Sequence, residues 1–119
     1  MLLWMTSLRV FAAASLAVGT ALAAVPAAHA DATAYLVNVT VRPGYNFPDA
    51  NAALAYGRGI CGEIAAGRPF ADIVADIKSD FRTTDDYQGT YLVSQAAQEL
   101  CPESIWQLRE LAAHYRGPA

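Results

Sequence analysis

Basic residues are scarce in this sequence, and histidine and cysteine are scarcer still. Of the 119 residues, eight are Lys or Arg, eleven are Asp or Glu, two are His and two are Cys, and the formal net charge is −3. Binding of nucleic-acid phosphates requires clustered basic side chains, and none of the basic residues cluster here. We therefore expect no nucleic-acid partner.

Motifs of catalytic and metal sites are also missing. The cysteines lack the CxxC spacing of redox and zinc sites. The sequence contains no Gly-rich phosphate loop, no paired-carboxylate motif and no nucleophile motif. His114 is the one histidine after residue 30, and the serines of that part, which also belong to no motif, are Ser79, Ser94 and Ser104. We predict that the protein is not an enzyme and holds no metal or cofactor.

Most of the apolar excess lies in the first 30 residues. Arg9 precedes a run of small and apolar residues over 10–25, which is followed by Pro26 and by the small-x-small sequence Ala28-His29-Ala30. This order predicts a signal peptide over residues 1–30 that is cleaved after Ala30. The protein is therefore expected to be secreted or to reside in the cell envelope.

Two alternatives remain for this N-terminal segment. An uncleaved anchor helix is the weaker one, because the apolar run is short for a bilayer and a cleavage site follows it, so no stable membrane span is expected after cleavage. The other concerns the initiator. Residues 1–4 are unusually apolar for the start of a signal peptide, and a start at Met5 instead of Met1 gives a normal profile.

Removal of the signal peptide leaves residues 31–119 as one small domain, near the size at which a core alone is marginally stable. This part keeps all eleven acidic residues and seven of the eight basic ones, for a formal charge of −4. Cys61 and Cys101 both lie in it, and thiols of exported proteins pair and persist. We expect one disulfide that closes a loop of 40 residues and contributes about 4 kcal/mol.

Apolar side chains recur at helical intervals in four segments of this domain. Pro48 and Asp49 precede the first segment, Gly67 ends it, and Pro102 separates the third from the fourth. The predicted helices cover residues 49–66, residues 69–81, a third segment from the capping run 83–86 to residue 101, and residues 103–116.

Three aspartates of the second segment suggest a cation site at first sight. Asp72, Asp76 and Asp80 recur every fourth residue, opposite the apolar stripe. Carboxylates one turn apart along an outer face do not converge on one point, whereas a hard cation needs several converging oxygens. We therefore interpret them as a solvated face.

The segment 31–47 is ambiguous. Residues 35–41 alternate as a strand would, with Tyr35, Val37, Val39 and Val41 in one set. No second strand is visible to pair with it, so a short helix over 32–41 is preferred. The fold class we predict is all-α: a disulfide-linked bundle of four to five short helices.

The sequence DANAALAYGRGICGEIAAGRPFADIVADI, the break at Gly67 and the pair Cys101-Pro102 together resemble a known family. It comprises small secreted actinobacterial, chiefly mycobacterial, proteins and is called domain of unknown function seven-three-two. The resemblance covers roughly residues 31–102. It implies secretion and a disulfide-linked helical fold, and it supplies no activity, cofactor or catalytic residue. This chain continues for 17 residues after Pro102, where many members stop soon.

Two functions are compatible with these features. The favoured one is a non-catalytic interaction module of the envelope or extracellular medium, whose partner is an unknown protein or a second copy of the chain. The extra helix 103–116 offers a possible interaction face, although it could instead pack on the core. The alternative is a carrier of a small hydrophobic ligand such as lipid or haem, with a tyrosine or His114 as iron ligand. The residues of the possible interaction face are Trp106, Leu111 and Tyr115.

Overall fold

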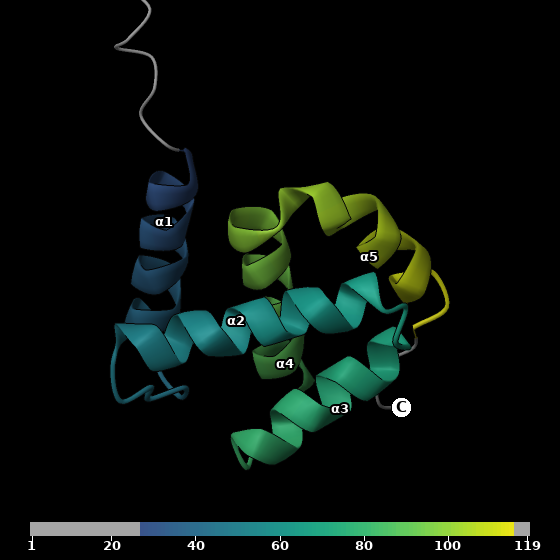
Figure 1. Ribbon diagram of the computed structural model, residues 1–119. Helices are drawn as coiled ribbons and strands as arrows, with labels where there is room; N and C mark the ends of the chain where they lie inside the picture. The colour runs from purple at the N-terminus through teal and green to yellow at the C-terminus, as the bar shows by residue number, and fades with distance from the viewer. Residues whose placement is uncertain (1–26, 116–119) are drawn as a thin grey trace, which may run out of the picture.

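The computed structural model describes residues 27–115, and every regular element in that range is helical. The all-α prediction is confirmed. Four helices precede a π-helical turn, η3, and a 3-10 turn, η4, leads into the last helix (Figure 1). The elements in order are α1 (Ala27–Val41), α2 (Ala50–Ala65), α3 (Phe70–Asp80), α4 (Asp86–Gln95), η3 (Ala96–Leu100), η4 (Pro102–Ser104) and α5 (Ile105–Ala112).

The ambiguous N-terminal segment is a helix, α1, and it begins five residues earlier than expected. A helix satisfies its backbone hydrogen bonds internally, whereas a strand here has no partner among the described residues. In the helix, Tyr35 and Val39 are buried while Val37 and Val41 are exposed, so the alternating set is divided between two faces. The predicted cleavage site after Ala30 falls within α1, and the rest of the predicted signal peptide, with Met1 and Met5, lies outside the described residues.

The boundaries of α2 follow the predicted signals closely. The carboxylate of Asp49 accepts a hydrogen bond from the amide of Ala52 at 2.8 Å and caps the helix. Gly67, with φ of 78°, turns the chain after the helix ends, a conformation that favours glycine.

The third predicted helix divides into α4 and η3. Asp85 caps α4 through the amide of Tyr87, and the chain then widens into the π-helical turn. The helical geometry ends at Cys101, whose φ of −144° is extended. This end was expected, because Pro102 disfavours helical backbone in the residue before it.

The core lies where α2, α3, α4 and η3 meet, with α1 closing one side (Figure 1). The predicted stripe of α3 is buried against α4, and η3 packs against both α1 and α2. Phe47 is half-buried and packs against the core in an aromatic group with the buried Tyr45 and the half-buried Tyr56 and Phe81. The largest fully buried side chains are Tyr35, Ile64, Ile73, Val74, Ile77, Leu92 and Val93.

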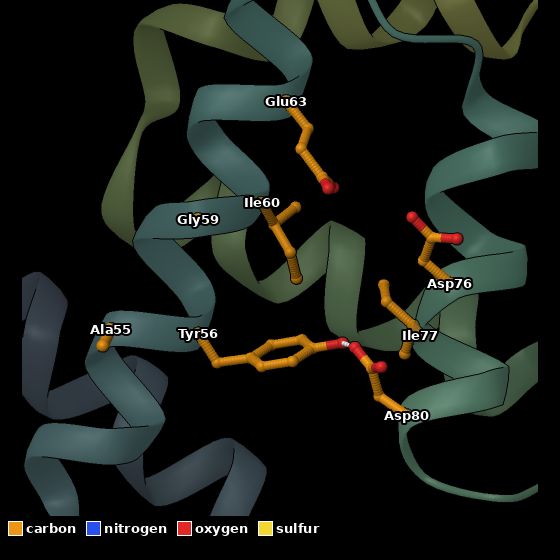
Figure 2. A pocket seen from close by; sticks show the side chains of 8 residues that line it. All are labelled: Ala55, Tyr56, Gly59, Ile60, Glu63, Asp76, Ile77 and Asp80. Carbon is orange, nitrogen blue, oxygen red and sulfur yellow. Dashed lines mark hydrogen bonds between the residues drawn. The ribbon is translucent and has the colours of Figure 1, made fainter.

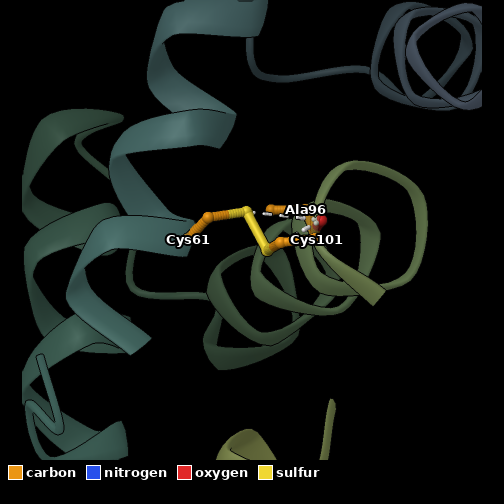
Figure 3. Close-up of a disulfide and its surroundings, with 3 residues drawn as sticks. All are labelled: Cys61, Ala96 and Cys101. Carbon is orange, nitrogen blue, oxygen red and sulfur yellow. Dashed lines mark hydrogen bonds between the residues drawn. A yellow bond between two sulfur atoms is a disulfide. The ribbon is translucent and has the colours of Figure 1, made fainter. Parts of the chain in front are cut away.

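A disulfide joins Cys61 of α2 to Cys101 at the end of η3 (Figure 3). Their Cα atoms are 6.1 Å apart, and 40 residues separate them in sequence. Because the cross-link holds α2 and the end of η3 together, the predicted disulfide-linked helical bundle is the observed fold. Within residues 27–115, no helix has the length and apolar character needed to cross a membrane.

Candidate functional site

The C-terminal extension folds as η4 followed by α5, which ends at Ala112, four residues before the predicted end at 116. Its three predicted interaction residues separate. Leu111 and Tyr115 are half-buried and pack against the core, whereas Trp106 is 73% exposed. The Tyr115 ring meets Phe70 edge-on, with centroids 4.8 Å apart, and its hydroxyl donates to Asp86. The extension therefore both covers the core and presents an aromatic side chain outward.

Trp106 belongs to an open hollow of about 330 Å³ that we call the Trp106 surface. The Arg109 guanidinium lies 4.9 Å from the centre of the indole ring, within the range of a cation–π contact. Tryptophan and arginine are enriched among residues that dominate protein interfaces. The surface is formed by Trp106, Arg109, Glu110, Ala113 and His114.

A second hollow of about 310 Å³ lies between α2 and α3 (Figure 2). Ile60 and Ile77 line it from opposite sides, and Glu63 of α2 points toward Asp76 of α3 (Figure 2). The Tyr56 hydroxyl donates a hydrogen bond of 2.6 Å to Asp80 (Figure 2). The rim of this α2–α3 cleft is therefore acidic above an apolar floor.

Arg68 neutralises part of this rim. Its Nη1 lies 2.5 Å from Asp76 Oδ2 and 3.4 Å from Glu63 Oε1. Burial raises the pKa of Glu63, while Arg68 acts in the opposite direction. Asp76 and Asp80 were expected on a solvated face, and no site was predicted at Tyr56 and Glu63. The separation of these two residues by seven positions places them on one side of α2. In the described range, no group of three or more His, Cys, Asp or Glu side chains is arranged to hold a metal ion.

The tyrosines considered as iron ligands take part in the fold. Tyr35 donates to the Ala53 carbonyl at 2.9 Å, and Tyr45 donates to the Gln88 carbonyl at 2.6 Å. The hydroxyls of two more are bonded to aspartates, as described above for Tyr56 and Tyr115. The rings of the last two tyrosines, Tyr87 and Tyr91, lie against the Arg42 guanidinium. The remaining candidate ligand, His114, follows α5 and is exposed.

Tyrosine ionisation should make the protein sensitive to alkali. Burial raises the pKa of Tyr45 to about 12, and burial together with the Asp86 hydrogen bond raises the pKa of Tyr115 to about 12. Burial also raises the pKa values of Tyr35 and Tyr56. Each folded-state pKa exceeds the unfolded value of about 10, so the folded state holds these protons more tightly. Their contribution to stability is complete below about pH 10 and is lost as the pH rises toward 12.

Urea unfolding near neutral pH and at about pH 11 checks this expectation. The free energy of unfolding should fall between the two conditions, and it should fall less in Tyr115→Phe, which lacks one titrating hydroxyl. An equal fall in the variant would remove Tyr115 from the explanation.

Comparison with known proteins places the chain in a family. The family model described as "Protein of unknown function (DUF732)" matches residues 30–103, more than half of the chain. The match runs from α1 into η4 and ends before α5. No curated protein and no solved structure is significantly similar. The chain belongs to the DUF732 family of proteins of unknown function.

Proposed function

We propose that this protein is a non-catalytic interaction module of the cell envelope or the extracellular medium, and that it contacts a protein partner through the Trp106 surface. The observation that carries the proposal is the exposure of Trp106, at 73%, on a helix whose opposite face is packed on the core. An exposed indole that a partner covers removes a large apolar area from water.

The location outside the cytoplasm has two supports. Residues 1–30 have the order of charge, apolar run and small-x-small site that a signal peptide requires. The Cys61–Cys101 disulfide is of a kind that persists mainly in oxidising compartments.

Contact through Trp106 is favoured by the way in which α5 is held. Tyr115 and Leu111 attach the helix to the core, so the backbone that carries Trp106 is ordered before a partner arrives. Arg109 also restrains the indole from one face. Ordering of the contact residue in advance reduces the entropy lost on binding.

Carriage of lipid or haem has weaker support. Four tyrosine hydroxyls already have hydrogen-bond partners within the fold. The described hollows also lie at the lower end of the volumes typical of sites that bury a drug-sized ligand.

Site-specific photo-crosslinking in a secreting host tests the proposal. A photoreactive phenylalanine analogue replaces Trp106 in one variant and Gln107, the exposed neighbour on the same helix, in the control. We expect position 106 to form one defined protein adduct that position 107 does not form. An adduct between two copies of the chain would identify a homo-oligomer assembled through this surface.

Trp106→Ala should then weaken binding of the identified partner at least tenfold, which corresponds to about 1.4 kcal/mol. Gln107→Ala should leave binding unchanged. The unfolding midpoints of both variants should stay within error of the unsubstituted protein, because both side chains are exposed. Equal adducts from the two positions, or unchanged affinity in Trp106→Ala, would refute the proposal.

A further inference from the structure

A third hollow, of about 350 Å³, lies on a different part of the molecule from the Trp106 surface. It is enclosed by the second half of α1, the connecting segment 42–49 and the first turn of α2, and we call it the α1–α2 cleft. Leu36, Val39, Phe47 and Ala53 contribute apolar surface. The polar and remaining lining residues are Thr40, Arg42, Pro43, Asn46, Asp49 and Ala50.

Hydrogen bonds hold the walls of this cleft in place. The Tyr35 hydroxyl joins α1 to the Ala53 carbonyl of α2 at 2.9 Å. On the other side, the buried side chain of Gln88 donates from Nε2 to the Pro43 carbonyl at 3.0 Å. Gly44 packs so closely on Gln88 that a Cβ atom there would clash with the amide. A ligand would therefore enter a preformed site and would have little protein to order.

The two charged groups of the lining are already engaged. Arg42 Nε donates to Gln88 Oε1 at 2.9 Å, and its guanidinium lies over the rings of Tyr87 and Tyr91. The carboxylate of Asp49 caps α2. Both charges therefore take part in contacts that hold the fold, and they balance each other in the lining.

Two neutral polar side chains of the rim are free by contrast. The hydroxyl of Thr40 and the amide of Asn46 are both exposed and form no hydrogen bond with another described residue. Each can donate and accept. The cleft therefore combines a fixed apolar floor with unused neutral hydrogen-bonding groups.

We propose that the α1–α2 cleft binds a small uncharged amphipathic molecule. Its ring or short aliphatic part lies against Leu36 and Phe47, and its hydroxyl or amide group bonds Thr40 and Asn46. The lining holds one charge of each sign, Arg42 and Asp49, so it offers neither an anion nor a cation a net attraction that would offset the loss of hydration, and the cleft selects against charged analogues. This site is independent of the partner contact proposed for Trp106.

Titration of the isotope-labelled protein, purified from a secreting host, tests the proposal by NMR. The probes are benzyl alcohol and two charged molecules of similar shape, benzoate and benzylamine. We expect benzyl alcohol to shift the amide resonances of Thr40, Asn46, Phe47 and Ala50 in a saturable manner. The charged probes should bind at least tenfold more weakly. Shifts that do not saturate, shifts centred elsewhere or equal binding of all three probes would overturn the proposal.

Three variants at exposed positions locate the site without disturbing the core. Ala50→Phe places a ring in the cleft from an exposed position and should abolish saturable binding, whereas Ala65→Phe, an exposed position of α2 outside the cleft, should leave it unchanged. Thr40→Val keeps the shape of the side chain and should weaken binding of benzyl alcohol at least threefold through loss of the hydroxyl. Unchanged binding in Ala50→Phe, or equal loss in Ala65→Phe, would refute the assignment.

Discussion

Loss of the Cys61–Cys101 disulfide should lower the free energy of unfolding by about 4 kcal/mol. The cross-link closes a loop of 40 residues, which restricts the unfolded chain more than the folded one. Small domains have only about 5–15 kcal/mol of stability in total, so this loss is a large fraction. The double variant Cys61→Ala/Cys101→Ala should show it directly in urea unfolding.

Reduced protein without substitutions provides the control for this measurement. Its stability should match that of the double variant to within about 1 kcal/mol, because the half-buried Cys61 and the buried Cys101 also lose small packing contributions on substitution. A difference of less than about 1 kcal/mol between oxidised and reduced protein would contradict a stabilising role for the disulfide.

Gly57→Ala should destabilise the protein by about 2 kcal/mol, although alanine is the better helix former. A Cβ atom at this position would lie 2.5 Å from Leu100 Cδ1 and 2.7 Å from the Tyr35 hydroxyl oxygen. Tyr35 is fully buried and hydrogen-bonded to Ala53, so it cannot move aside cheaply. The overpacking cost of about 3 kcal/mol exceeds the propensity gain of about 1 kcal/mol.

The same helix contains two matched controls. Gly59 and Gly62 also lie inside α2, and a Cβ atom at either position meets nothing within 4 Å. Gly59→Ala and Gly62→Ala should each raise the free energy of unfolding by about 0.5–1 kcal/mol. Thermal or urea unfolding of the three variants compares one chemical change in two environments. Shifts of the same sign in all three would contradict the packing argument for Gly57.

The elements predicted best from the sequence are those with local signals at both ends. The helix α2 has its cap at Asp49 and its break at Gly67, and its bounds differ from the prediction by one residue at each end. In α3, the apolar stripe gave both the helix and its buried face. The end of the helical segment at Cys101 was predictable from Pro102 alone, because proline disfavours helical backbone in the residue before it.

Features that depend on distant residues were harder to predict. The alternation of residues 35–41 resembles a strand, and only the lack of a partner strand argued for α1. The α2–α3 cleft was missed because it brings Tyr56 and Glu63 of one helix opposite Asp76 and Asp80 of the next. Periodicity within one helix does not report which residues of another helix lie across from it.

Trp106 and Leu111 of the predicted interaction face lie on different sides of α5 for a reason that helix geometry explains. Leu111 follows Trp106 by five residues, which places the two side chains roughly 140° apart around the axis of α5. One can face the core only when the other faces away. The structure accordingly packs Leu111 and exposes Trp106.

The position of the cross-link also determines what a protease can release. Residues 61–101 form a covalently closed ring that contains α3, α4 and η3, whereas α1 and α5 are open arms on either side of it. A single cut at the exposed turns near Gly67 or Arg82 leaves both fragments attached to each other until the disulfide is reduced. A cut between Pro102 and Ile105 breaks the covalent link to the arm that carries Trp106, which is then held only by its packing on the core. Proteolysis there would thus separate the proposed partner contact covalently from the ring and leave the ring itself intact.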